Sequence, residues 1–229
     1  MDGKTLKGNS SFRALAVKRF SGDWKKIPSF EIGGKKSFRR KTSSGKDFSA
    51  RGQLAFDAEN FHIRVTVKDD VFLHKAFPMT GNRWENDSLQ IFIDTRCSAR
   101  KNNTRTFDED DYAYTLIPEP DGKRAFLFRY RSPDIQLTLG VSAPKDMTAA
   151  RDVPCSFTRT KDGYIYECSI PARYILPARL EKNYAMGFAL YLNDRDDHGK
   201  GVANTLTMTP PGTAPYNRPH FYPVILLTE

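Results

Sequence analysis

Short runs of alternating apolar and polar residues are the feature that most restricts how this chain can fold. Turn-forming residues bound these runs, and no long segment repeats apolar residues at the 3.6-residue period of a helix. Such runs pair into sheets whose apolar faces stack. We therefore expect an all-β protein: a single antiparallel β-sandwich of jelly-roll or immunoglobulin-like two-sheet architecture. The expected strands are residues 50–56, 61–67, 88–94, 112–118, 123–130, 135–139, 156–160, 164–170, 185–193, 204–209 and 222–227, with one helical turn at 171–175.

Two short polar turns, at residues 57–60 and 161–163, each separate a pair of alternating runs and predict β-hairpins. The second hairpin would place Cys155 opposite Cys168. Both cysteines are in phase with the apolar residues of their strands, so they either form a disulfide or remain two buried thiols. The third cysteine is Cys97, and no Cys-x-x-Cys motif is present, so a zinc site is not expected.

The positive charge of the chain is confined to its beginning. Residues 1–50 contain thirteen Lys or Arg and four Asp or Glu, which accounts for the whole net charge of +9. Residues 51–229 contain 23 basic and 23 acidic residues and are therefore neutral overall. A nucleic-acid-binding domain would carry basic and aromatic residues among its folded elements, so no nucleic-acid partner is expected. We assign residues 1–20 to a basic N-terminal arm and residues 21–229 to the sandwich. No run approaches the roughly 18 apolar residues of a membrane span.

Several segments carry a family resemblance, and they occur in a consistent order. They are residues 21–24, the hairpin of residues 53–57 and 61–65, residues 84–94, residues 163–171 and residues 193–194. The most specific is 84–94, where a tryptophan and acidic residues precede a strand that ends in Phe-Ile-Asp. Together these segments resemble the family 9 carbohydrate-binding modules (CBM9-like, related to DOMON-like β-sandwiches). The resemblance covers the chain from about residue 20 to its end.

This resemblance implies a site in which two aromatic side chains hold a sugar between them, with polar groups at the rim. Trp84 and Tyr216 lie at the two aromatic positions, and Gln90 lies at the floor, where the family has a glutamate. Ala113 and Thr115 replace a glutamine and an arginine of the family, so we expect weak binding. The candidate carbohydrate-binding residues are Trp84, Tyr216, Gln90, Tyr114 and Thr115.

Residues 193–199 concentrate oxygen ligands in one turn, a composition that hard cations such as calcium favour. The resemblance also implies structural calcium. We therefore predict a calcium site at Asp194, Asp196 and Asp197, with a solvated polar turn as the alternative.

The function expected from these features is that of a non-catalytic module that binds an oligo- or polysaccharide. No nucleophile motif and no carboxylate pair suited to glycoside cleavage is present, so we do not expect an enzyme. The resemblance implies linkage to other domains of a larger exported carbohydrate-active or surface protein, hence an extracytoplasmic location. Two alternatives remain: a haem-binding electron-transfer β-sandwich using Met79, Met186 or Met208, and a protein-interaction module with a degenerate sugar site.

Overall fold

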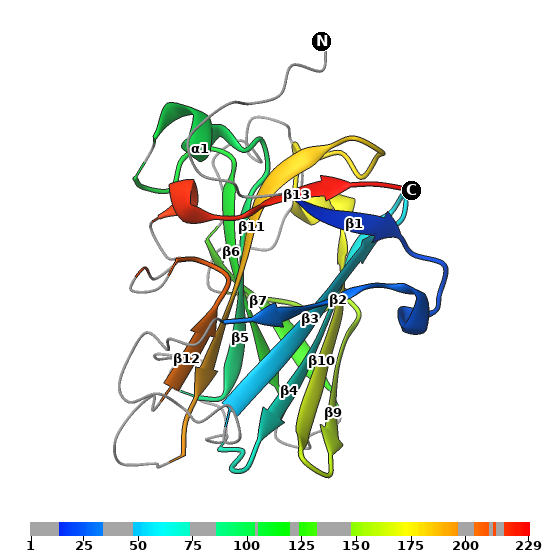
Figure 1. Ribbon diagram of the computed structural model, residues 1–229, viewed down its shortest axis with the longest axis vertical. Helices are drawn as coiled ribbons and strands as arrows, with labels where there is room; N and C mark the ends of the chain where they lie inside the picture. The colour runs from blue at the N-terminus through cyan, green and yellow to red at the C-terminus, as the bar shows by residue number, and fades with distance from the viewer. Residues whose placement is uncertain are drawn as a thin grey trace.

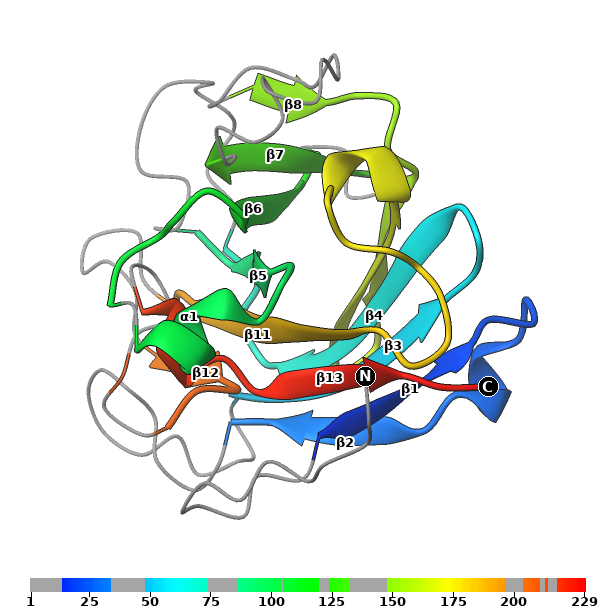
Figure 2. The ribbon, with the colours of Figure 1, turned by 90° about the horizontal axis from the view of Figure 1, so that it is seen from above.

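A computed structural model describes residues 14–33, 48–73, 86–103, 105–119, 124–131, 148–196, 204–210, 213 and 218–229. The expected strand at 135–139 lies outside these residues. The described chain is almost entirely β-structure, arranged as two stacked sheets (Figures 1 and 2). None of the described helices is long and apolar enough to cross a membrane.

The first sheet has the strand order β8-β7-β6-β5-β11-β13, and β12 also pairs with β11. All of these pairs are antiparallel. β12 and β13 share one edge of β11 at its two ends, whereas β5 occupies the other edge. The strands are β5 (Ser88–Asp94), β6 (Asp111–Pro118), β7 (Ala125–Arg131), β8 (Thr148–Ala150), β11 (Ala185–Asp194), β12 (Asn204–Thr207) and β13 (Val224–Leu227).

The second sheet has the order β3-β4-β10-β9, with β2 on the other side of β3, and its pairs are also antiparallel. Both hairpins expected from the sequence are confirmed, because β3 turns directly into β4 and β9 into β10. The strands are β2 (Ser29–Ile32), β3 (Phe48–Phe56), β4 (Asn60–Asp69), β9 (Cys155–Thr160) and β10 (Gly163–Pro171).

One strand, β1 (Leu15–Arg19), joins the two sheets. Its first half runs parallel to β13, and its second half runs parallel to β3. On the opposite side of the sandwich, Arg124 and Ser156 form a bridge between the sheets. One expectation is corrected here: the sandwich is not purely antiparallel. Residues 15–19, which were assigned to the arm of residues 1–20, form a strand of the sandwich.

The core lies between the sheets, because alternate residues of each strand point to the facing sheet. Aromatic residues fill much of it; the largest fully buried side chains of this core include Tyr112, Tyr114, Tyr164, Tyr166, Phe48, Phe61, Phe157 and Phe188. Short helices occur only at connections of the described chain: η1 (Trp24–Lys26), α1 (Ser98–Asn102), η3 (Ala172–Tyr174) and η4 (Pro219–Phe221). The turn expected at 171–175 contains η3.

Candidate functional site

A row of side chains crosses the outer face of the first sheet, the face turned away from the core. Strand register places these residues directly opposite one another on neighbouring strands, so all of them point to the same side. We call this set the outer row; its members, in order from β12 to β7, are Thr207, Tyr191, Gln90, Thr115 and Phe128.

Gln90 lies at the centre of the outer row and is half-buried, as is Thr207 at its β12 end. Its two neighbours, Thr115 and Tyr191, are each 6% exposed, and Phe128 is fully buried. A second cluster of buried apolar residues shares this face and supports Tyr191: Phe92, Phe107, Ala113, Ala189, Tyr191 and Tyr222. The outer row therefore presents an amide that donates and accepts hydrogen bonds, with a hydroxyl and aromatic surface beside it.

Tyr114 is not part of this face, which corrects its prediction as a sugar-binding residue. It lies next to Thr115 on β6, and adjacent residues of a strand point to opposite faces of a sheet. Its ring is buried in the core beside Tyr112, with ring centroids 5.9 Å apart. Its hydroxyl donates a hydrogen bond to the backbone oxygen of Tyr174. Tyr114 therefore fixes η3 to the core.

Three of the predicted site residues, Trp84, Tyr216 and Asp197, lie outside the described residues. The aromatic pair therefore remains a prediction. Tyr191 and Thr207 are outer-row residues that sequence reasoning missed. The signal was the alternation of β11, which puts Tyr191 on the same face as Asn193 and opposite to Leu190 and Leu192.

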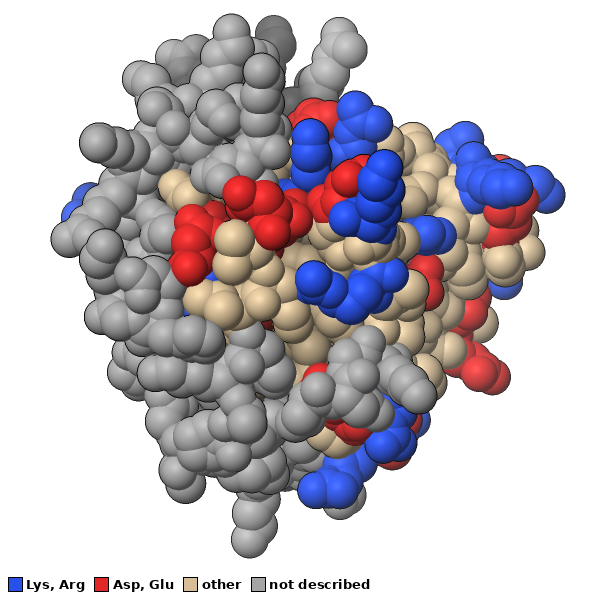
Figure 3. All heavy atoms as spheres, turned by 90° about the horizontal axis from the view of Figure 1, so that it is seen from below, with Lys and Arg blue, Asp and Glu red and all other residues tan. Residues whose placement is uncertain are grey.

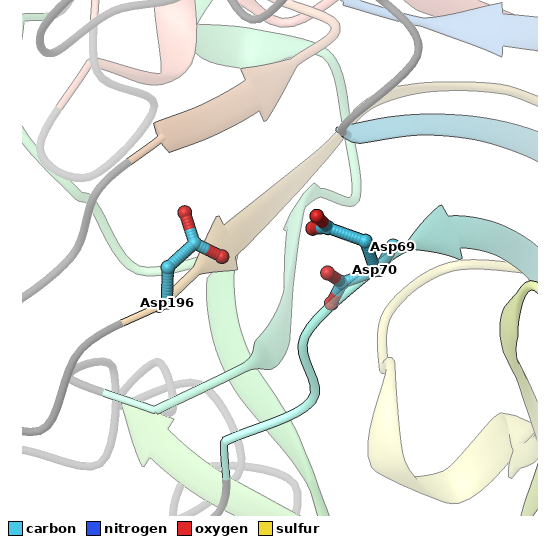
Figure 4. A group of neighbouring side chains, drawn as sticks. All are labelled: Asp69, Asp70 and Asp196. Carbon is cyan, nitrogen blue, oxygen red and sulfur yellow. The ribbon is translucent and has the colours of Figure 1, made fainter.

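Two of the predicted metal ligands, Asp194 and Asp196, meet other carboxylates at the end of the sandwich where β4 and β11 finish. One carboxylate oxygen from each of Asp69, Asp87 and Asp194 lies within 4.8 Å of the others, and the same holds for Asp69, Asp70 and Asp196. In Figure 4, Asp69 and Asp70 at the end of β4 face Asp196 beyond the end of β11. Figure 3 views this end of the molecule and shows acidic side chains grouped beside basic ones.

Burial perturbs these carboxyl groups strongly. Asp87 is fully buried, and burial together with the charge of Asp69 raises its pKa to about 9. Burial also raises the pKa of Asp69 to about 6. The pKa of Asp196 is raised as well, by burial and by the nearby Asp70. Carboxylates that converge in a buried place repel one another, so each holds its proton more tightly unless a cation is present.

The hydrogen bonds of these carboxylates do not use every carboxylate oxygen. Both oxygens of Asp87 accept backbone N–H groups, Oδ1 from Arg195 at 2.7 Å and Oδ2 from Leu73. Asp69 Oδ1 accepts the N–H of Val71 at 3.0 Å, but its buried Oδ2 has no hydrogen-bond partner of good geometry among the described residues. An all-oxygen donor set with an unsatisfied carboxylate oxygen fits a hard cation such as calcium. Sequence reasoning missed Asp69 and Asp87 because they are far from residues 193–199 along the chain.

In a second acidic group, around the start of α1, carboxylates accept hydrogen bonds from backbone N–H groups. Asp94 Oδ1 and Oδ2 accept the N–H groups of Ser98 and Ala99 at 3.0 and 3.1 Å, and Asp110 Oδ2 accepts that of Arg96 at 2.8 Å. These carboxylates shape the connection between β5 and β6.

Asp57, His62 and Ser169 form a hydrogen-bonded chain on the second sheet. His62 Nδ1 lies 2.9 Å from Ser169 Oγ, and His62 Nε2 lies 2.8 Å from Asp57 Oδ2. The residue types match those of a hydrolase triad, but Ser169 and His62 are simply opposite each other on paired strands. The ring of Phe20 also packs against that of His62 in a tilted arrangement, with centroids 4.4 Å apart. These hydrogen bonds link the β3–β4 hairpin to β10.

The described methionines do not favour a haem site. Met186 is fully buried in the core, and Met208 packs against the same core. Both serve as packing residues. Met79 lies outside the described residues.

Comparisons with known proteins agree with this fold. The model of the family described as "Carbohydrate family 9 binding domain-like" matches residues 21–229. The endo-1,4-beta-xylanase C of Paenibacillus barcinonensis is 28% identical over 169 residues, which are 73% of this chain but 12% of that xylanase. The endo-1,4-beta-xylanase A of Thermotoga neapolitana is 30% identical over 158 residues, 69% of this chain and again 12% of that enzyme. The chain thus spans about an eighth of the length of these relatives.

Solved structures show the same architecture. A family 9 carbohydrate-binding module from Caldicellulosiruptor kristjanssonii, in complex with cellotriose, aligns over 94% of both chains with a TM-score of 0.66 and 16% identity. Its complex with glucose aligns equally well. A putative carbohydrate-binding protein from Bacteroides uniformis aligns with a TM-score of 0.58 and 11% identity. The family match covers nearly the whole chain and the fold agrees with it, so this protein belongs to the family 9 carbohydrate-binding domain-like proteins.

Proposed function

We propose that this chain is a non-catalytic carbohydrate-binding module that holds a sugar against the outer face of its first sheet. The observation that carries the proposal is the outer row, in which half-buried Gln90 lies between Thr115 and Tyr191 at the position where the family resemblance puts the floor of the site. The similar module of Caldicellulosiruptor kristjanssonii is in complex with cellotriose or glucose, which supports a glucose-type ligand for this chain.

Each residue of the site has a defined role in this proposal. The Gln90 amide exchanges hydrogen bonds with sugar hydroxyls, and the Thr115 hydroxyl supplies a second, weaker partner. Trp84 and Tyr216 supply the flat apolar faces that cover the C–H surfaces of the sugar ring. Gln90 carries no charge, so its hydrogen bonds are weaker than those of a carboxylate. We therefore expect a dissociation constant on the order of a millimolar, as is usual when few charge-assisted contacts orient a small ligand.

The chain works, in this proposal, as one part of a larger exported protein with an extracytoplasmic location. The xylanases that it resembles are about eight times longer than the matched region. Tethering a weak binding module to other domains raises its effective concentration at a polysaccharide without any new contact.

Titration calorimetry with cellotriose and glucose tests the sugar site. Gln90→Ala and Trp84→Ala should each weaken binding about tenfold or more, because each removes a group that contacts the sugar. Thr66→Ala is the matched control, since Thr66 is exposed on the second sheet. Binding that is equally strong in Gln90→Ala and Trp84→Ala would refute the site. No binding of the wild type to either sugar or to a glycan array would favour the protein-interaction module.

We further propose that the carboxylates of Asp69, Asp87 and Asp194 hold a calcium ion that stabilises the fold, with Asp70 and Asp196 beside it; Asp197, also expected at this site, lies outside the described residues. The convergence of three buried carboxylates and the unsatisfied Oδ2 of Asp69 support this site. The ion would fix the loop after β4 to the end of β11. It would contribute stability rather than chemistry, and removing it should lower the melting temperature.

A further inference from the structure

Cys155 and Cys168 lie directly opposite each other on the hairpin of β9 and β10. Their neighbours, Pro154 and Ser169, are joined by a backbone hydrogen bond in which Ser169 N–H donates to Pro154 O at 2.9 Å. In an antiparallel pair, hydrogen-bonded and non-hydrogen-bonded positions alternate, so Cys155 and Cys168 occupy a non-hydrogen-bonded position. Side chains approach most closely at such positions, with Cα atoms about 4.5 Å apart, which lies within the range of disulfides.

The two sulfur atoms are 2.8 Å apart. Two sulfur atoms without a bond between them normally lie farther apart. The backbone and both side chains are therefore already close to the geometry of a disulfide. We propose that Cys155 and Cys168 form a disulfide bond when the protein folds in an oxidising compartment. The inference that these two cysteines can bond rests on the strand register. Only the inference of an oxidising compartment rests on the proposed extracytoplasmic location.

The chemistry is a thiol–disulfide exchange with a disulfide donor, such as glutathione disulfide or a disulfide oxidoreductase. The partly exposed Cys155 attacks the donor as a thiolate, forms a mixed disulfide and releases one donor thiolate. The Cys168 thiolate then attacks the Cys155 sulfur and releases the second. Two cysteine thiols lose two protons and two electrons, and the donor disulfide is reduced to two thiols.

Burial makes the pair slow to react in the folded protein. Cys168 is 2% exposed, and burial together with Cys155 raises the pKa of its thiol well above the ordinary value. Little thiolate is therefore present at this residue once the protein has folded. The exchange should be fastest during folding, and the finished bond should resist reductants until the hairpin opens.

The position of the bond indicates what it does. Among the described strands, β9 lies at the edge of the second sheet and pairs only with β10. Ser156, next to Cys155, forms the bridge to Arg124 of the first sheet. The disulfide would fix β9 to β10 where the two sheets meet, and thereby hold that side of the sandwich closed.

Thiol counting tests the proposal directly. The protein is refolded in a glutathione redox buffer, unfolded in the presence of iodoacetamide and weighed by mass spectrometry. We expect one alkylated cysteine, and three when the protein is reduced before alkylation. A peptide map should show Cys155 linked to Cys168. Three alkylated cysteines in both samples, or a link that includes Cys97, would overturn the proposal.

Thermal unfolding with matched variants gives a second readout. The oxidised wild type should melt about 5 to 10 °C above the reduced protein, because the bond closes the loop between Cys155 and Cys168 and so lowers the conformational entropy of the unfolded chain. Cys97→Ser should keep this difference, and Cys155→Ala should abolish it. If Cys155→Ala does not fold, Cys97→Ser still decides the question by its thiol count. A wild type that melts at the same temperature in both states would contradict the stabilising role.

Discussion

Replacing Asp87 by asparagine should have opposite effects with and without calcium. Asp87 is fully buried, and its pKa is raised from 3.8 to about 9. Without an ion, keeping this group protonated at pH 7 weakens the folded state by on the order of 4 kcal/mol, because the same group ionises freely in the unfolded chain. Asparagine removes this penalty. The asparagine oxygen still accepts the Arg195 N–H, but its NH₂ group faces the Leu73 N–H, which loses its acceptor. The loss of this hydrogen bond lowers the stability of the folded state by about 1–2 kcal/mol.

The ion-free variant should therefore be about 2 kcal/mol more stable than the ion-free wild type at pH 7. Calcium at a hundred times its dissociation constant should stabilise the wild type by about 2.7 kcal/mol and the variant by far less. Urea unfolding in chelator and in calcium measures both free energies. Asp162→Asn, in the exposed turn between β9 and β10, controls for loss of one negative charge. The reasoning is refuted if Asp87→Asn is destabilised equally in both conditions and gains from calcium as the wild type does.

Three further predictions follow from buried groups and from backbone geometry. Tyr114→Phe should lose about 1–3 kcal/mol of stability in urea unfolding, because a buried carbonyl loses its donor, yet should bind cellotriose as the wild type does. Gly163→Ala should lose more than about 3 kcal/mol, since φ is +148° and the new Cβ would lie 2.1 Å from the Val67 oxygen; Gly22→Ala, with φ +84° and open space, should lose only about 1 kcal/mol. Burial raises the pKa of Asp111 to about 8, so the folded state binds this proton more tightly than the unfolded state does, and stability falls as pH rises from about 4 to 8. The fall in the urea midpoint over that range should be smaller in Asp111→Asn.

The strands with strong alternation could be predicted from the sequence. Residues 88–94 form β5 at the expected bounds, and the hairpin turns at 57–60 and 161–163 placed their strands in register. β1 was missed, because Leu15–Arg19 is short and its partners are parallel strands distant in the sequence. No local sequence pattern predicts such a pairing.

The candidate site was only partly predictable for a related reason. Gln90 and Thr115 were found through the family resemblance, and strand pairing brings them together. Naming Tyr114 as a sugar-binding residue was wrong, because it points to the opposite face from its neighbour Thr115 and is buried in the core. The acidic cluster joins Asp69, Asp87 and Asp194 from three separate parts of the chain. A sequence window can show that each is acidic, but only the fold shows that their carboxylates converge.

The position of β1 between the two sheets also sets the order in which the chain can fold during synthesis. The strands β2, β3, β4, β9 and β10 all lie before residue 172, so the second sheet can form before β11, β12 and β13 emerge. Among the described strands β1 comes first and its partner β13 comes last, and Thr228 donates hydrogen bonds to the Val17 oxygen across 211 positions. Closing so long a loop is slow and entropically unfavourable until the strands on either side are already formed. Of the described pairings, the one between β1 and β13 is therefore the last that can form during synthesis, and β1 must stay free of wrong partners until β13 has been made.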